Sequence, residues 1–150
     1  MRKTVMTGLL TAMLFSAPLA MPTRAWASDW PTTGGDYWEV TGVHIKDGGD
    51  LAYLKFLAAE WKADQEFAKS KGWIKGYTVL GNVHPRKGES DLYLVIMYER
   101  MPTGAESEKR ADEYLAWKKK STTQLEKESG NRVEIREIQD TALMQELKFK

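Results

Sequence analysis

The sequence predicts an α+β fold in which a four-stranded antiparallel sheet carries two helices on one face. Segments rich in β-branched and aromatic residues alternate with segments of helical spacing, in the order β-α-β-β-α-β. The two halves of that order resemble each other, and the segment expected to form the third strand is apolar without interruption. Together these observations predict the split βαβ, or ferredoxin-like, arrangement.

The N-terminus has the pattern of a secretory signal peptide. Arg2 and Lys3 form a positively charged start, an apolar run follows from Val5 to Leu19, and Ala25-Trp26-Ala27 fits an A-x-A cleavage site. The apolar run is shorter than the about 20 residues that a membrane helix needs. We therefore expect a signal peptide over residues 1–27, cleaved after Ala27. The mature protein is then periplasmic or secreted and has no membrane association.

The composition of the chain is that of a single small domain. It has 150 residues, a formal net charge of +1 and no cysteine. A near-neutral charge offers no electrostatic footprint for nucleic acid, so a nucleic-acid partner is not expected. Without cysteine there is neither a disulfide nor a lipidated anchor, which suits a soluble exported bacterial protein. We expect a flexible lead-in over residues 28–35, rich in turn formers, and one domain over residues 36–150.

Each element is expected from its own local pattern. An Asp-Gly-Gly turn ends the first strand, Asp50 is the expected N-cap of the first helix, and Gly72 ends that helix. The last segment, residues 143–149, is expected to be a fifth short strand or a terminal arm. The expected strands are residues 37–46, 73–83, 91–100 and 132–138, and the expected helices are residues 50–71 and 105–127.

The third strand predicts a homodimer. Leu92 to Tyr98 are apolar in succession, and neighbours in a strand point to opposite faces, so both faces are apolar. Two helices cover only one of them. Leaving such side chains in water forgoes about 1.5–3 kcal/mol each, against a domain stability of roughly 5–15 kcal/mol. A second copy packed around a two-fold axis is the expected cover. The alternative is a monomer whose C-terminal segment folds over the open face.

The β-α-β-β-α-β order, the doubly apolar third strand and the strand RVEIREI (residues 132–138) resemble the dimeric α+β barrel superfamily. The stretch from Gly88 to Val95 is similar to that of small uncharacterised exported bacterial proteins with this layout. The resemblance implies that two ferredoxin-like sheets pair into a barrel. That superfamily holds cofactor-independent monooxygenases, haem-degrading enzymes, chlorite-dismutase-like proteins and members without a known reaction, so the fold does not select a function.

Four residues are candidates for a ligand site: Trp38, His44, Tyr77 and Asn82. His44 shares its side of the first strand with Trp38, and an imidazole facing a barrel interior can bind a ligand or accept a proton. The alternative for His44 is a hydrogen-bonded or solvent-facing histidine at a strand end. Asn82 either points into a cavity or marks the end of the second strand, and Tyr77 is a further polar group that could converge on the cavity.

Two other groups of polar residues do not indicate a catalytic or metal site. Ser90, Asp91 and His84 lie close in sequence, but the strained turn and oxyanion arrangement of a nucleophilic triad are missing. His44, Asp47 and Asp50 have the spacing of metal ligands, yet Gly48-Gly49 between them is typical of a turn before a helix. We therefore predict neither a metal site nor a cofactor.

Three functions remain open. The leading hypothesis is an exported domain of uncharacterised activity that binds a small apolar ligand between its sheets. The second is an enzyme, either a cofactor-independent monooxygenase-like or a haem-handling member of the superfamily. The third is a protein-interaction module that pairs through a sheet face or edge.

Overall fold

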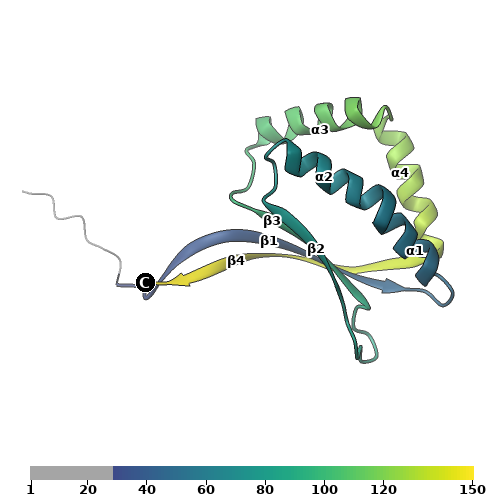
Figure 1. Ribbon diagram of the computed structural model, residues 1–150, viewed down its shortest axis with the longest axis horizontal. Helices are drawn as coiled ribbons and strands as arrows, with labels where there is room; N and C mark the ends of the chain where they lie inside the picture. The colour runs from purple at the N-terminus through teal and green to yellow at the C-terminus, as the bar shows by residue number, and fades with distance from the viewer. Residues whose placement is uncertain (1–28) are drawn as a thin grey trace, which may run out of the picture.

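The computed structural model describes residues 29–150, so the predicted signal peptide at residues 1–27 lies outside the described residues. The fold is α+β, with one open antiparallel sheet and a layer of helices on one side of it (Figure 1). The strands are β1 (Thr32–Ile45), β2 (Gly76–Gly81), β3 (Leu92–Tyr98) and β4 (Arg136–Phe149), and the helices are α1 (Asp50–Phe56), η1 (Leu57–Trp61), α2 (Lys62–Ser70), α3 (Gly104–Lys118), α4 (Thr122–Asn131) and η2 (Arg132–Glu134).

The four strands lie in the order β2-β3-β1-β4, and every neighbouring pair is antiparallel. β1 and β4 are each 14 residues long, whereas β2 has 6 and β3 has 7. The β1–β4 pairing runs from Thr32 opposite Phe149 to Ile45 opposite Arg136. The two long strands therefore continue as a ribbon past the rest of the sheet, as Figure 1 shows.

The C-terminal third differs from the expectation. Residues 132–138 were expected as the fourth strand and residues 143–149 as a separate strand or arm, but residues 136–149 form the single strand β4, and residues 132–134 form the short helix η2. The reason is the length of β1, whose backbone pairs with β4 throughout apart from two register shifts. For the same reason β1 begins at Thr32, inside the stretch predicted as a flexible lead-in.

The first helix is continuous from Asp50 to Ser70, close to the expected residues 50–71, but its middle turn, η1, is a π-helix. Its N-cap is Gly49 and not Asp50. The Gly49 amide donates to the carbonyl of Lys46 at 2.8 Å, and a β-carbon on Gly49 would lie only 2.4 Å from the carbonyl oxygen of Ile135. The close approach of the Ile135 carbonyl therefore leaves no room for a side chain at position 49.

The second helix breaks where the sequence pattern predicted one helix over residues 105–127. α3 ends at Lys118, and Lys119 has a left-handed backbone with φ of 54°. Ser121 then caps α4: its hydroxyl accepts from the Gln124 amide at 3.3 Å, and its own amide donates to the Gln124 side chain at 2.8 Å. This capping box satisfies donors that a new helix start leaves open, so the chain turns and restarts.

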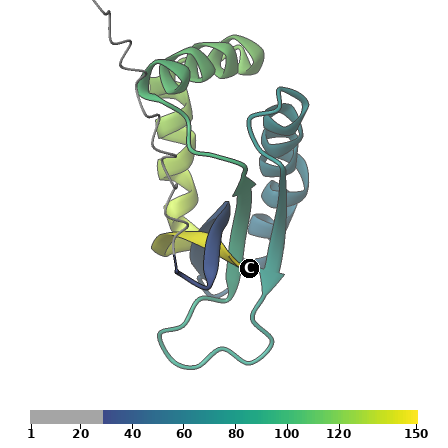
Figure 2. The same cartoon turned by 90° about the vertical axis from the view of Figure 1, so that its left-hand side faces the viewer.

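The core lies between the sheet and the first helix. Val43 of β1 and Leu94 of β3 pack against Tyr53 and Leu57. α3 lies on α2 through an aromatic cluster in which the Phe67 and Trp117 rings stack with centroids 4.4 Å apart. In Figures 1 and 2 the helices gather on one side, while the β2–β3 loop extends away from them. Among the helices formed by residues 29–150, none is long and apolar enough to cross a membrane.

The turn before α1 gives the first prediction. Gly49→Ala places a methyl group against the Ile135 carbonyl, and we expect the free energy of unfolding in urea to fall by about 1–3 kcal/mol, as overpacking does. Gly130→Ala is the matched control, because its β-carbon meets open space within α4, and we expect a gain of about 0.5–1 kcal/mol there. Equal effects at the two glycines would contradict the close packing of the turn.

The start of α3 gives the second prediction. Arg100 donates to both Glu106 carboxylate oxygens, at 2.5 and 2.8 Å, and the Thr103 amide donates to the same carboxylate. The Arg100 bonds, and then that amide, lower the pKa of Glu106 to about 2 from its ordinary 4.5. A lowered pKa stabilises the fold above the ordinary value, and this stabilisation is lost as the pH falls toward 2.

We therefore expect Glu106→Gln to lower the thermal unfolding midpoint at pH 6, and the difference from the wild type to shrink steadily below about pH 4.5. Calorimetry across this range measures it. Glu108→Gln, on the same helix and solvent-exposed, is the control for a change of charge alone. A Glu106→Gln deficit that is independent of pH would show that the Arg100 pair does not contribute.

Candidate functional site

The sheet face opposite the helices is apolar and uncovered in the described part of the chain. Trp38 is 41 % exposed and Met144, its partner in the strand pairing, is 53 % exposed on this face. We call it the open face. The strand register defines two apolar rows across it: Gly76, Met97, Trp38 and Met144 in one row, and Thr78, Val95, Val40 and Ala142 in the next.

A polar row closes one end of the open face. Asn82 follows β2, Asp91 precedes β3 and His44 lies near the end of β1. His44 Nδ1 lies 2.8 Å from Asp91 Oδ2, and the Ile45 amide donates to that same oxygen at 2.8 Å. The Asn82 side-chain amide donates to the Ser90 carbonyl at 3.1 Å. The pairing of β1 with β3 thus brings together residues 47 positions apart in the chain.

The local geometry explains why Asp91 holds the histidine. β3 begins one residue after Asp91, so Ile45 has no backbone acceptor in β3, and the Asp91 carboxylate replaces it. A carboxylate accepts hydrogen bonds, so His44 Nδ1 donates and carries the ring proton when the imidazole is neutral. Nε2 is then left with its lone pair. The side chain of His44 is 45 % exposed, which leaves the ring accessible to a ligand.

The His44–Asp91 pair lines two cavities, each of about 460 Å³. One is bordered by the β2–β3 loop at residues 85–89 and by Gln139. The other lies toward the start of α1 and includes Asn82. Volumes of about 300–1,000 Å³ are typical of small-molecule sites. The arrangement offers an oriented imidazole as a proton acceptor or ligand-binding group at the edge of an apolar surface.

Ser90 is only 4 % exposed, but its position is not that of a nucleophile. Its hydroxyl donates to Gln139 Oε1 at 2.6 Å, and Gly42 leaves room for it beside β1. His84 is exposed on the loop, where its backbone amide donates to Asn82 Oδ1 at 3.3 Å. Asp91 pairs with His44 instead of His84. Among residues 29–150, no three histidine, aspartate or glutamate side chains gather closely enough to hold a metal ion.

The structure brings only part of the predicted site together. His44 and Asn82 line one cavity, and Trp38 lies further along the same face of the sheet. Tyr77 is on the helix side: its ring packs edge-on against Trp61 with centroids 5.4 Å apart. Its hydroxyl donates to Glu66, a bond that raises the pKa of Tyr77. Tyr77 therefore belongs to a separate groove of about 300 Å³ beside β2.

Sequence reasoning missed the His44–Asp91 pair. The available signal was that His44 comes late in the first strand and Asp91 just before the third, so antiparallel pairing of the two strands places them at the same end. No protein-family model matches this chain, and neither a curated protein nor a solved structure shows significant similarity to it. Membership of the dimeric α+β barrel superfamily thus stays a prediction.

The His44–Asp91 pair gives the third prediction. In long-range ¹H–¹⁵N correlation spectra at alkaline pH, we expect neutral His44 to carry its proton on Nδ1, because Asp91 accepts it. Asp91→Ala removes the acceptor and should move His44 toward the Nε2-protonated form. His84 is the internal control, since Asp91 makes no contact with its ring. A His44 spectrum that Asp91→Ala leaves unchanged would exclude the oriented imidazole.

Proposed function

We propose that the protein is an exported ligand-binding domain that works as a homodimer, with a small apolar ligand held between two sheets. The observation that carries the proposal is the apolar open face. The ferredoxin-like assignment is supported by the strand order β4-β1-β3-β2, in which a strand of one β-α-β unit separates the two strands of the other. Export is supported by the charged start and apolar run of the N-terminal sequence.

The size of the open face suits a second copy of the chain. Strands are spaced about 4.8 Å apart and rise about 3.3 Å per residue, so the face covers roughly 650 Å² in projection. A standard protein interface buries about 800 Å² on each partner. A two-fold axis lets one face cover its own copy, so the same apolar rows serve on both sides.

The chain has no other described segment with which to cover the face. The alternative cover was the C-terminal segment, but residues 136–149 are paired with β1 inside the sheet as β4. The helices lie on the opposite side, where Val43 and Leu94 pack against them. A second subunit is therefore the cover that the described residues favour.

The contents of the proposed barrel follow from the rows that would line it. Trp38, Val40 and Met97 present apolar surface, which favours an apolar ligand. His44 and Asn82 at the end of the face supply polar groups, which would orient a ligand that has one polar end. Native mass spectrometry of the protein purified from its exported form would identify a ligand that copurifies.

An enzyme is the second candidate, and the His44–Asp91 pair favours it. With Nδ1 bound to Asp91, Nε2 is oriented to take a proton from a substrate, as a cofactor-independent monooxygenase-like reaction would need, or to ligate haem iron. A Soret band that forms on haem addition and is lost in His44→Ala would support haem handling. If the wild-type chain forms no Soret band on haem addition, haem handling is excluded.

The dimer gives the fourth prediction. We expect Met144→Glu to weaken self-association at least 100-fold in sedimentation equilibrium, because it places a charge against the apolar face of the partner. Leu51→Glu is the matched control, since Leu51 is also exposed and apolar but lies on α1, and it should leave association unchanged. If both variants associate as the wild type does, the open face is not the dimer interface.

A further inference from the structure

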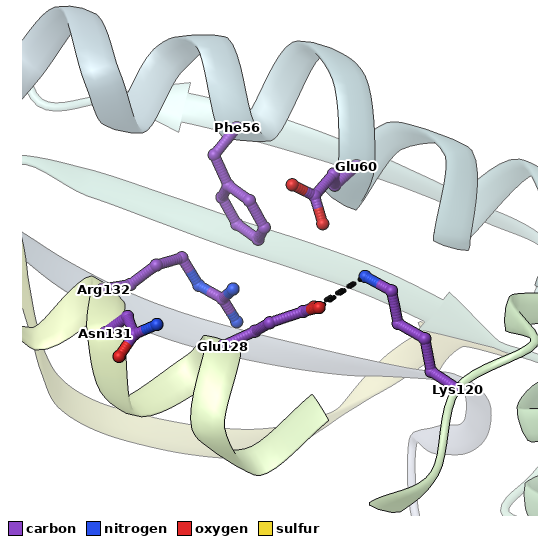
Figure 3. A pocket seen from close by; sticks show the side chains of 6 residues that line it. All are labelled: Phe56, Glu60, Lys120, Glu128, Asn131 and Arg132. Atoms are coloured by element: carbon purple, nitrogen blue, oxygen red, sulfur yellow. Dashed lines mark hydrogen bonds and ion pairs between the residues drawn. The ribbon is translucent and has the colours of Figure 1, made fainter. Parts of the chain in front are cut away.

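A third cavity, of about 410 Å³, lies within the helix layer, away from the open face. Figure 3 shows Phe56 and Glu60 pointing from the first helix toward side chains of α4 and η2. It is lined by Phe56, Glu60, Lys120, Glu128, Asn131 and Arg132. Two of these side chains are cationic and two are anionic, so the cavity as a whole is neutral.

Arg132 forms the positive wall. Its guanidinium carbon lies 4.2 Å from the centroid of the Phe56 ring, which fixes the group by a cation–π contact. Its Nε is buried and has no hydrogen-bond partner among the described residues. Buried donors are nearly always paired in folded proteins, so an unpaired one beside a cavity indicates a place for an acceptor.

Glu60 forms the negative wall. It lies in the π-helical turn η1, and such turns are frequent at functional sites. Lys120 is already paired with Glu128, at 2.6 and 2.8 Å from its two carboxylate oxygens. Within residues 29–150, no hydrogen bond or ion pair engages the Glu60 carboxylate, and none joins it to Arg132. Two opposite charges thus face one cavity without satisfying each other.

We propose that this cavity binds a zwitterionic molecule of the size of an α-amino acid. The Arg132 guanidinium and the Asn131 side chain would take its carboxylate, Glu60 would take its ammonium group, and an apolar side chain would lie near Phe56. A simple anion would meet Glu60 and Glu128, and a simple cation would meet Arg132 and Lys120. The lining therefore selects a ligand that carries both charges.

A matched set of ligands tests the proposal on the mature chain. L-phenylalanine carries both charges, 3-phenylpropionate lacks the ammonium group and phenethylamine lacks the carboxylate. By NMR titration we expect L-phenylalanine to bind at least about tenfold more tightly than either analogue, since each lost charged hydrogen bond weakens binding by that order. No binding of L-phenylalanine at millimolar concentration, or equal binding of all three, overturns the proposal.

Variants test which residue binds the ammonium group of the ligand and which binds its carboxylate. Glu60→Gln should remove the preference for L-phenylalanine over 3-phenylpropionate, and Arg132→Gln should remove its preference over phenethylamine. Arg132→Lys keeps a positive charge over Phe56 and gives a folded comparison if Arg132→Gln is unstable. Glu126→Gln, on α4 but outside the cavity, should change neither preference. Unchanged preferences in Glu60→Gln would overturn the assignment, whatever the oligomeric state of the protein.

Discussion

The structure depends on one constraint: the sheet is apolar on both faces, but its single layer of helices covers only one of them. β3 shows the constraint most clearly. Leu94 lies in the core against the first helix, and its neighbour Val95 points to the opposite face, where the side chains around it in the sheet bury it while Trp38 and Met144 stay 41 % and 53 % exposed. Because a strand alternates between faces, one layer of helices covers only half of the apolar side chains, and Trp38 of β1 and Met144 of β4 remain exposed on the other face. The proposed dimer is the consequence of that constraint.

The same antiparallel pairing builds the polar end of the open face. β3 begins opposite Val43, two residues before the end of β1, and the Asp91 carboxylate completes the hydrogen bonding of β1 while it orients His44. A backbone requirement and a side-chain orientation are thus met by one carboxylate. The imidazole lies where the apolar rows meet charged side chains such as Arg86 and Asp47, so a ligand that reaches it is expected to have an apolar body and a polar end.

Local patterns predicted much of the fold. The α+β class and the antiparallel sheet are confirmed, and the first helix and the third strand lie close to their expected bounds. These elements have long runs of a single periodicity. The ferredoxin-like description, the barrel and the dimer stay predictions, because they concern partners and relationships beyond one chain.

The features that local sequence patterns did not predict depend on pairing between distant segments or on competing local signals. β4 runs unbroken through residues 139–142, which lack a strong strand pattern, because the long β1 pairs with it. The break at Lys119 follows from the cap that Ser121 offers, which outweighs the helical pattern on both sides. His44 with Asp91 and Glu60 with Arg132 are each brought to one place only by the tertiary fold, which single-sequence periodicity does not contain.

The mass of the wild-type mature chain in solution tests the central claim most directly. Multi-angle light scattering at micromolar concentration should give twice the mass of one chain, because in the proposed dimer each subunit covers the open face of the other. A single-chain mass at that concentration, with Trp38 and Met144 still exposed to solvent, would contradict the account.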